Sequence, residues 1–305
     1  MQNKPHWAMK LHTLSFTTFL FLCFFGFQSC NPPTTPQEEQ SDISSTLVDS
    51  TFSYNETATT AQQTRLEVPQ LKDPNWFIQY NHYALEYDTA QRHSIWVAYV
   101  FHADYNQKNV SRTDAWAFCP IIPREYQSLS SKSQTFPGYD RGHLIASEDR
   151  VFSEIANKET FYFSNISPQL GWFNQQIWKN LEIAVRKWAQ APDCDTLYVV
   201  TGGAINPGIE IIGKLENRNN VTIPKYYFKA LVKRKGDNFD GIAFWLENKR
   251  HESSKVTHEY SMTIRELEEL TDINFFPNLN YVISANPKLE EIVETTRDTT
   301  KWRLQ

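Results

Sequence analysis

The sequence contains few cysteines, and this scarcity limits the kinds of site it can build. Four occur in 305 residues; Cys23 and Cys30 lie within the first thirty, which leaves Cys119 and Cys194 for the rest of the chain. No Cys-x-x-Cys pair and no Cys/His spacing typical of zinc ligands occurs, so a zinc site is not expected. The sequence leaves open whether Cys119 and Cys194 form a disulfide or remain two buried free thiols.

The sequence also lacks an excess of positive charge, since its formal net charge is -5. The first thirty residues carry two lysines, and residues 31–70 carry six acidic residues and one arginine. The remaining chain is therefore slightly acidic. A protein that holds nucleic acid tightly through its phosphates would show a basic excess. An enzyme that turns over such a polyanion needs only a local basic cleft, so the composition disfavours a tight binder more than it disfavours an enzyme.

The N-terminus has the pattern of a targeting segment. Lys4 and Lys10 precede a mostly apolar run, residues 14–27, which is about as long as the core of a secretory signal and too short to span a membrane. Gln28-Ser29-Cys30 follows and resembles the cleavage site of bacterial lipoproteins, where the cysteine becomes the lipidated N-terminus. We interpret residues 1–30 as a signal peptide of the lipoprotein type; an ordinary secretory signal or an uncleaved anchor is the alternative.

Two further segments are expected to lie outside a folded domain. Residues 31–70 are rich in Pro, Ser, Thr, Gln and Glu and have few apolar residues, which predicts a disordered tether. Residues 286–305 are charged and are predicted to be a peripheral tail. The domain is therefore expected to cover residues 71–285.

Within that domain, apolar residues recur with the periods of strands and helices. Strands are predicted at 83–87, 94–101, 160–164, 196–201 (ended by Gly202-Gly203), 226–232 and 241–246, and helices at 173–190 and 263–271. Segment 112–139, which has several Pro and Gly residues and many Ser, is predicted to be a loop. Strands and helices do not alternate as in βαβ units, so we expect an α+β fold with a mostly antiparallel central sheet flanked by helices.

The stretch Tyr139-Asp140-Arg141-Gly142-His143-Leu144 carries groups suited to phosphodiester hydrolysis. The ordinary pKa of a histidine lies near neutrality, so His143 could deprotonate water. Residues i and i+2 of an extended segment share a face, so Arg141 could reach the same phosphate. Gly142 would allow a backbone or a substrate to come close. Asp140 is interpreted as a brace for its own loop and is left outside the site.

A second group of candidates lies on the predicted helix 173–190. Asn174, Trp178 and Glu182 recur every four residues and are expected along one stripe. On an ideal helix Asn174 and Glu182 are roughly 12 Å apart, so both could ligate one ion only if Asn174 lay in an irregular first turn. The simpler arrangement is that Asn174 ligates directly and Glu182 acts through a water. A metal with one amide ligand keeps most of its waters, which suits Mg²⁺.

In this order and spacing, Asp140-Arg141-Gly142-His143, Asn165-Ile-Ser-Pro-Gln169, Asn174, Trp178 and Glu182 resemble the DNA/RNA non-specific endonucleases, a group that includes endonuclease G. The resemblance covers about residues 76–285. It extends to flanking segments at Trp96–Tyr99, Tyr198–Gly202, 224–232, Leu267–Thr271 and Phe275–Pro277. It implies the ββα-metal (His-Me finger) nuclease fold.

The resemblance also implies a role for each residue. His143 would activate water, Asn174 would be the direct Mg²⁺ ligand, and Glu182 would orient a metal-bound water. Arg141 would bind the phosphate together with an arginine some thirty residues upstream of the histidine; Arg112 matches best, and Arg92 is the alternative. Asn165 would brace the site, Mn²⁺ is a candidate substitute for Mg²⁺, and the products would carry 5′-phosphates.

The sequence thus predicts an exported Mg²⁺-dependent endonuclease for DNA, RNA or both, which contacts a membrane through a lipid at Cys30 and lies at the bacterial cell envelope or is secreted. It leaves open a homodimer and an inhibitor partner. Two other functions are alternatives. One is an inactive nuclease fold that binds nucleic acid at a surface, and the other is a phosphodiesterase for small nucleotide or lipid esters.

Overall fold

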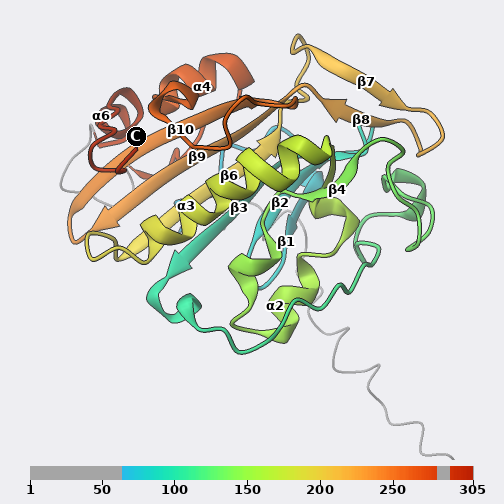
Figure 1. Ribbon diagram of the computed structural model, residues 1–305, viewed down its shortest axis with the longest axis horizontal. Helices are drawn as coiled ribbons and strands as arrows, with labels where there is room; N and C mark the ends of the chain where they lie inside the picture. Colours follow the sequence, from blue (N-terminus) through green and yellow to red (C-terminus); the bar gives the residue numbers. More distant parts are fainter. Residues whose placement is uncertain (1–63, 280–288, 305) are drawn as a thin grey trace, which may run out of the picture. The chain divides into compact units, whose positions relative to one another are not determined.

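The computed structural model describes residues 64–279 and 289–304 (Figure 1). The predicted signal peptide with Cys30, most of the tether and the predicted domain end at residue 285 lie outside these residues. None of the helices in the two described ranges is long and apolar enough to cross a membrane.

Strands form most of the regular structure. They are β1 (Phe77–Gln79), β2 (Ala84–Asp88), β3 (His93–His102), β4 (Asp140–His143), β5 (Ile166–Gln169), β6 (Thr196–Gly203), β7 (Ile211–Leu215), β8 (Val221–Pro224), β9 (Tyr226–Lys235), β10 (Asn238–Glu247) and β11 (Ser261–Met262). The α-helices are α2 (Glu154–Glu159), α3 (Lys179–Ala189), α4 (Ile264–Thr271) and α6 (Leu289–Thr295). A π-helical segment, Phe173–Trp178, leads into α3. Short 3-10 turns lie at Pro74–Trp76, Ala103–Asn106, Arg124–Tyr126, Ser147–Arg150, Phe163–Asn165 and His258–Tyr260.

Seven strands form one sheet in the order β1-β2-β3-β6-β9-β10-β11, and every neighbouring pair in it is antiparallel. The strand pairs β4-β5 and β7-β8 form two small separate two-stranded sheets. The predicted α+β class with a mostly antiparallel sheet is confirmed. The predicted strands at 83–87, 94–101, 226–232 and 241–246 correspond to β2, β3, β9 and β10, and the predicted helix 263–271 corresponds to α4.

The sheet is covered on both faces. Val97, Tyr99 and Phe101 of β3 pack into one core with the apolar side of α3, whereas Trp96 and Ala98 of the same strand pack into a second core with α4. Figure 1 shows α3 lying across the sheet on one side, with α4 and α6 beside β10. A strand that alternates between two cores is apolar throughout, which is why residues 94–101 carry no polar face.

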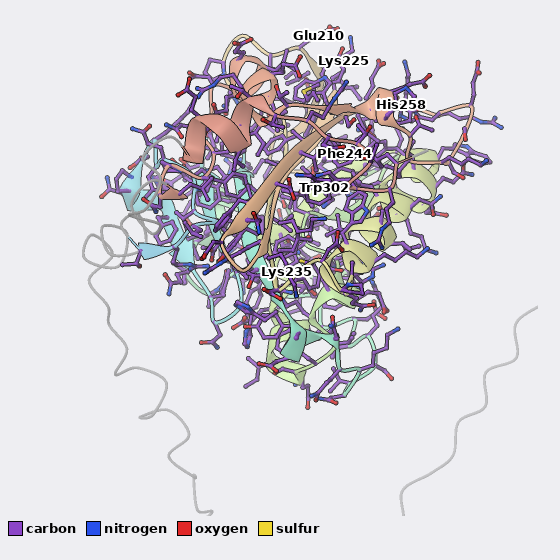
Figure 2. The ribbon with its side chains drawn as sticks, turned by 90° about the vertical axis from the view of Figure 1, so that its left-hand side faces the viewer. Glu210, Lys225, Lys235, Phe244, His258 and Trp302 are labelled. Atoms are coloured by element: carbon purple, nitrogen blue, oxygen red, sulfur yellow. The ribbon has the colours of Figure 1, made fainter. Side chains whose placement is uncertain are left out.

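The C-terminal segment is not peripheral, which corrects the prediction for residues 286–305. Val293 on α6 and Trp302 are both buried. The Trp188 indole donates a 2.7 Å hydrogen bond to the Trp302 carbonyl, and its ring stacks on Phe244. Trp302 and Phe244 of β10, both labelled in Figure 2, each contact the Trp188 ring. One buried tryptophan removes a large apolar area from water, which is enough to hold a segment that otherwise carries many charges. The charged composition of residues 286–305 therefore did not predict whether the segment packs on the domain.

Two element predictions were wrong. Residues 160–164 form no strand: Tyr162 makes an isolated bridge with Ala117, a 3-10 turn follows, and the strand begins at Ile166. The end of the strand predicted at 196–201 was placed two residues too early, since Gly202 and Gly203 are the last two residues of β6. A Cβ on Gly202 would clash with Phe228, and one on Gly203 would clash with Pro224. Apolar runs therefore located these strands but did not fix their ends.

The packed chain begins before residue 71. Leu66 and Val68, in the predicted tether, are buried in the second core. The Asn278 side chain donates to the Arg65 carbonyl at 2.9 Å, and the Gln70 amide donates to the Asn274 carbonyl at 2.9 Å. The prediction of a disordered tether was therefore wrong for residues 64–70. Its two buried apolar side chains are enough to pack this stretch against the domain, although their neighbours in the sequence are polar.

The question of the cysteines is also answered. Cys119 and Cys194 are both free thiols in the structure. Cys119 is buried and lies 2.8 Å from the Tyr80 hydroxyl, so its sulfur has a polar partner other than a second cysteine.

We predict that shortening the chain to begin at residue 71 destabilises it. Compared with a chain that begins at residue 64, the free energy of unfolding should fall by about 2–4 kcal/mol, since burial of Leu66 and Val68 is lost and the entropy regained offsets part of it. Urea unfolding followed by tryptophan fluorescence measures the difference. The Val68→Ala variant of the longer chain should lose part of the same stability, and equal midpoints for all three proteins would contradict the packing described.

Candidate active site

The candidate residues lie on a compact module in which β4 pairs antiparallel with β5 and the chain then enters the π-helical segment and α3. In this register Arg141 lies opposite Pro168, Gly142 opposite Ser167, and His143 opposite Ile166. A Cβ on Gly142 would lie 2.1 Å from Oε1 of Gln169, so the glycine is required by this neighbouring side chain. The expected close approach at Gly142 is present, but its partner is Gln169 of the protein.

Asn165 holds the chain on the C-terminal side of His143. Its side-chain oxygen accepts from the Ile145 amide at 3.0 Å, and its nitrogen donates to the carbonyls of Ile145 and Thr160 at 3.0 and 2.8 Å. Its backbone carbonyl accepts from the Leu144 amide at 3.0 Å. A fully buried asparagine with this many bonds fixes the direction in which β4 leaves the site.

Two side chains from other elements hold the same turn. The Trp178 indole donates to the His143 carbonyl at 3.3 Å, and the Lys229 ammonium of β9 donates to the Leu144 carbonyl at 3.4 Å and to the Thr201 hydroxyl at 3.1 Å. The ammonium also lies 4.3 Å from the centre of the Trp178 ring. The position of His143 is therefore tied to the large sheet as well as to its own hairpin.

The side chain of His143 is 8% exposed, and its imidazole packs against two aromatic rings. The ring centroids of Trp116 and Phe161 are 5.4 and 5.0 Å from it. Its Nε2 atom is buried and has no hydrogen-bond partner in the described protein. A buried polar atom without a partner is costly, and in a cleft it marks a place where another group is expected to bind.

Two arginines flank these rings. The Arg141 guanidinium lies 3.7 Å from the centre of the Trp116 ring, and that of Arg112 lies 4.8 Å from the centre of the Phe161 ring. Arg112 also donates to Asp114 and to the Ser147 hydroxyl, each at 2.8 Å. Burial, and then the charges of Arg112 and Arg141, lower the pKa of His143 to about 3. The imidazole is therefore neutral at physiological pH, as a general base must be.

The two upstream arginines lie in different parts of the structure. Arg112 lies close enough to His143 and Arg141 for its charge to act on both. Arg92 lies in the turn between β2 and β3 with a positive φ of 56°, and its charge acts on Tyr87 instead. Arg112 is the arginine that belongs with the other candidates.

Asn174 is oriented by Asp140. The amide nitrogen of Asn174 donates to a carboxylate oxygen of Asp140 at 2.9 Å, and the neighbouring Gln175 donates to the same oxygen at 2.8 Å. Because the nitrogen donates to Asp140, the amide oxygen points away from that carboxylate, and it accepts no hydrogen bond from another described residue. The interpretation of Asp140 as a brace for its own loop was wrong: it fixes the amide plane of the expected metal ligand.

The helix that carries Asn174 does not begin as an α-helix. In the π-helical segment the Lys179 amide donates to the Asn174 carbonyl, five residues back, so the expected stripe through Asn174, Trp178 and Glu182 is interrupted. Trp178 is fully buried. Such π turns are frequent at functional sites because they change the direction of one side chain within a helix. Asn174 therefore lies in an irregular first turn, the alternative to a regular α-helix that the sequence analysis considered.

Glu182 of α3 is half-buried and lies near two buried charges, Lys229 and Asp149. Burial raises its pKa and the Lys229 ammonium opposes this rise; burial lowers the pKa of Lys229 and the Glu182 charge opposes that fall. Nearby, Asp149 pairs with Arg186 at 2.5 Å and accepts from the Tyr99 hydroxyl at 3.1 Å. Burial is the larger effect, so the pKa of Glu182 stays above its ordinary value, and the nearby cations limit that rise.

The sequence interpretation missed three contributors. Trp116, whose ring contacts both Arg141 and His143, lies in a predicted loop and gave no signal. Asp140 was considered and set aside. Lys229 did give a signal, since it is a lysine within an otherwise apolar run of β9, where a charge needs a specific partner.

Comparison with known proteins places the whole domain. The family model described as DNA/RNA non-specific endonuclease matches residues 62–282. Mitochondrial endonuclease G of Bos taurus is 26% identical over 204 residues, which cover 65% of this chain and 68% of the bovine protein. A nuclease of Nostoc sp. is 27% identical over 240 residues, which cover 75% of this chain and 81% of that protein.

Solved structures agree on the fold. The complex of EndoG with its inhibitor EndoGI matches with a TM-score of 0.62 and 24% identity, covering 73% of this chain and 93% of the matched chain. The ββα-metal fold predicted from the sequence is confirmed by this match, and the family match begins before residue 71, as does the packed chain. With more than half of its length matched, this chain belongs to the DNA/RNA non-specific endonuclease family.

Proposed function

We propose that this protein is a metal-dependent endonuclease that hydrolyses phosphodiester bonds of DNA, RNA or both. The observation that carries the proposal is the buried His143 imidazole, whose Nε2 atom has no partner in the described protein and whose pKa is lowered by burial and by the nearby Arg112 and Arg141. A neutral ring nitrogen beside two fixed cations suits the removal of a proton from water next to a phosphate. The family's description and the nucleases among the relatives support the same reaction.

In this proposal His143 accepts the proton of the attacking water. Arg112 and Arg141 bind the phosphate oxygens and stabilise the extra negative charge of the transition state. Both guanidinium groups lie against aromatic rings, where they are less hydrated than in open water and act more strongly on a bound phosphate. The product end is a 5′-phosphate, as the family resemblance implies.

The residues present fit a hydrated metal ion. Asn174 offers an amide oxygen, since its nitrogen is engaged by Asp140. An amide oxygen is a ligand that Mg²⁺ accepts, and one neutral protein ligand leaves most coordination positions to water. When bound, the ion supplies Lewis-acid stabilisation of the leaving oxygen. We propose Mg²⁺ as the ion, with Mn²⁺ as a substitute, and Glu182 as the residue that accepts hydrogen bonds from its waters.

We further propose that the protein is exported and anchored through a lipid on Cys30. The support is the sequence alone: two lysines, an apolar run and a small residue before the cysteine. Cys30 lies outside the described residues. A tether of roughly thirty residues between that cysteine and the packed domain would give the enzyme reach from the envelope.

Plasmid and RNA cleavage tests the activity. The purified full chain should nick supercoiled plasmid and degrade RNA in Mg²⁺ and should be inactive in EDTA. His143→Ala should lower the rate by roughly 10²–10⁴-fold, because the general base is lost. The exposed His258, whose replacement by alanine should leave the rate unchanged, provides a matched control.

Failure of that experiment has a clear meaning. If a folded sample cuts neither polymer in Mg²⁺, Mn²⁺ or Ca²⁺, the proposal is wrong. Binding of nucleic acid without cleavage would then point to an inactive binding module. Hydrolysis of mononucleotide esters would point to a small-ester phosphodiesterase.

The depressed pKa of His143 gives a second prediction. Histidine titration followed by NMR should place it well below 5 in the wild type. Arg141→Ala should raise it by about half a unit to one unit, because a nearby positive charge disfavours the imidazolium and its removal relieves that effect. Burial is the larger cause, so the pKa should remain below 6.5. Arg124→Ala serves as the control, and a wild-type pKa near 6.5 would show that the ring is not enclosed as described.

Membrane fractionation tests the anchor. Cells that express the full chain should retain it in the membrane fraction, and Cys30→Ser should release it to the soluble exported fraction. Cys23→Ser changes a cysteine inside the apolar run and should have no effect. Retention of the Cys30→Ser protein in the membrane would favour an uncleaved anchor over lipidation.

A further inference from the structure

Trp172 is the most exposed large aromatic residue in the described chain, with 54% of its surface accessible. Tyr126, at 37%, is the next, and most other rings are buried. Exposing a tryptophan leaves a large apolar area in water, so its presence on a surface calls for a contact that covers it. Trp172 directly precedes the π-helical segment and lies two residues before Asn174.

A cation lies against this ring. The Arg250 guanidinium is 4.5 Å from the centre of the Trp172 ring. The two lysines nearest to Arg250 along the chain and sheet both have carboxylate partners: Lys249 pairs with Glu247 at 2.5 Å and Lys225 with Glu210 at 2.6 Å. Figure 2 shows Lys225 beside Glu210. Arg250 has no such ion pair within the described ranges, so its charge remains available to an anion.

The pair is positioned by a buried asparagine. Asn248, which follows β10, accepts from the Leu170 amide at 2.9 Å and donates to the carbonyls of Pro168 and Pro224 at 3.4 and 3.1 Å. Its own amide donates to the Lys225 carbonyl at 2.7 Å. These bonds join the chain around residue 170 to the chain around residue 250. Trp172 and Arg250 therefore face each other because of a built junction and not because two flexible side chains happened to meet.

The pair also adjoins the candidate site. Gln175, three residues after Trp172, donates to the same Asp140 oxygen that orients Asn174. Trp172 thus lies at the end of the module where the proposed metal ligand is held. A strand whose phosphate reaches Asn174 would bring a neighbouring nucleotide near this ring.

We propose that Trp172, with Arg250 behind it, is a stacking platform for an unpaired nucleobase next to the scissile phosphate. The inference rests on the proposed nuclease function and adds a subsite to it. A base stacks on an aromatic ring without regard to its identity, which suits an enzyme without sequence preference. A cation on the ring strengthens the contact and can also reach the adjoining phosphate. A base inside a duplex is already stacked, so the platform favours single-stranded and distorted substrates.

Binding to a chain that cannot cut isolates the platform. The probes are a fluorescent single-stranded oligothymidylate and an abasic strand of equal length, which keeps every phosphate and lacks the bases. In the full-length His143→Ala background, Trp172→Ala should weaken oligothymidylate binding roughly tenfold and leave the abasic affinity unchanged. Trp172→Phe should restore most of the loss. Leu270→Ala removes a 46% exposed apolar side chain from α4, on the other side of the sheet, and should change neither affinity.

Cleavage kinetics then separate this proposal from the nuclease proposal. With His143 intact, Trp172→Ala should raise KM for single-stranded substrate and leave kcat nearly unchanged. Absence of cleavage by the wild type would refute the nuclease function. The platform would be refuted if the wild type cleaves normally and Trp172→Ala lowers the affinity for the two probes equally or lowers neither. Trp172 could instead be exposed because it forms a contact between two copies of the chain, which sedimentation of Trp172→Ala tests. If the substitution changes only the oligomeric state and not the binding of the two probes, the platform is wrong.

Discussion

The enclosed imidazole of His143 is the constraint on which the rest of the site depends. Burying a ring nitrogen without a partner costs of the order of 1–3 kcal/mol, and placing two cations nearby makes its protonation still less favourable. Such an arrangement persists only if the surrounding bonds leave the ring no alternative position. Asn165 fixes the chain after it, Trp178 and Lys229 hold its carbonyl and the next one, and Gly142 lets Gln169 close against the strand before it. The fold thus supplies the stability that the site itself lacks.

Lys229 connects this small module to the large sheet. A lysine with no exposed surface is expensive to bury, and here the cost is offset by two hydrogen bonds, the face of Trp178 and the nearby charge of Glu182. The same ammonium therefore donates to the carbonyl of Leu144, the residue after His143, and its charge acts on Glu182 of α3. One residue of β9 links the two halves of the proposed chemistry, so the geometry between β4 and α3 does not depend on their loop alone.

The sequence predicted the parts of this structure that depend on local pattern. The long apolar strands and the amphipathic helix were located, and the order of motifs identified the fold family. What failed depends on contacts between distant segments. Leu66, Val68 and Trp302 are single apolar residues in polar surroundings, and only the sheet against which they pack reveals their role. The π-helical turn at Asn174 has no composition signal, and Asp140 looked like a loop residue because its partner, Asn174, is thirty-four positions away. Of the two upstream arginines, sequence distance favoured Arg112, and the Phe161 ring, which contacts both Arg112 and His143, shows how it approaches the histidine.

The composition is slightly acidic, which disfavours a polyanionic substrate. The positions of the individual cations nevertheless allow the protein to bind one. Many lysines and arginines of this chain are neutralised by carboxylates in surface ion pairs, which contribute little to the field far from the surface. Arg141 and Arg250 instead lie on aromatic faces, at two places around Asn174. A cation on an aromatic ring keeps its charge for an incoming anion, whereas one in an ion pair must first give up its partner. Local recognition of phosphate is therefore compatible with weak global attraction, and an enzyme that must release its product gains from that combination.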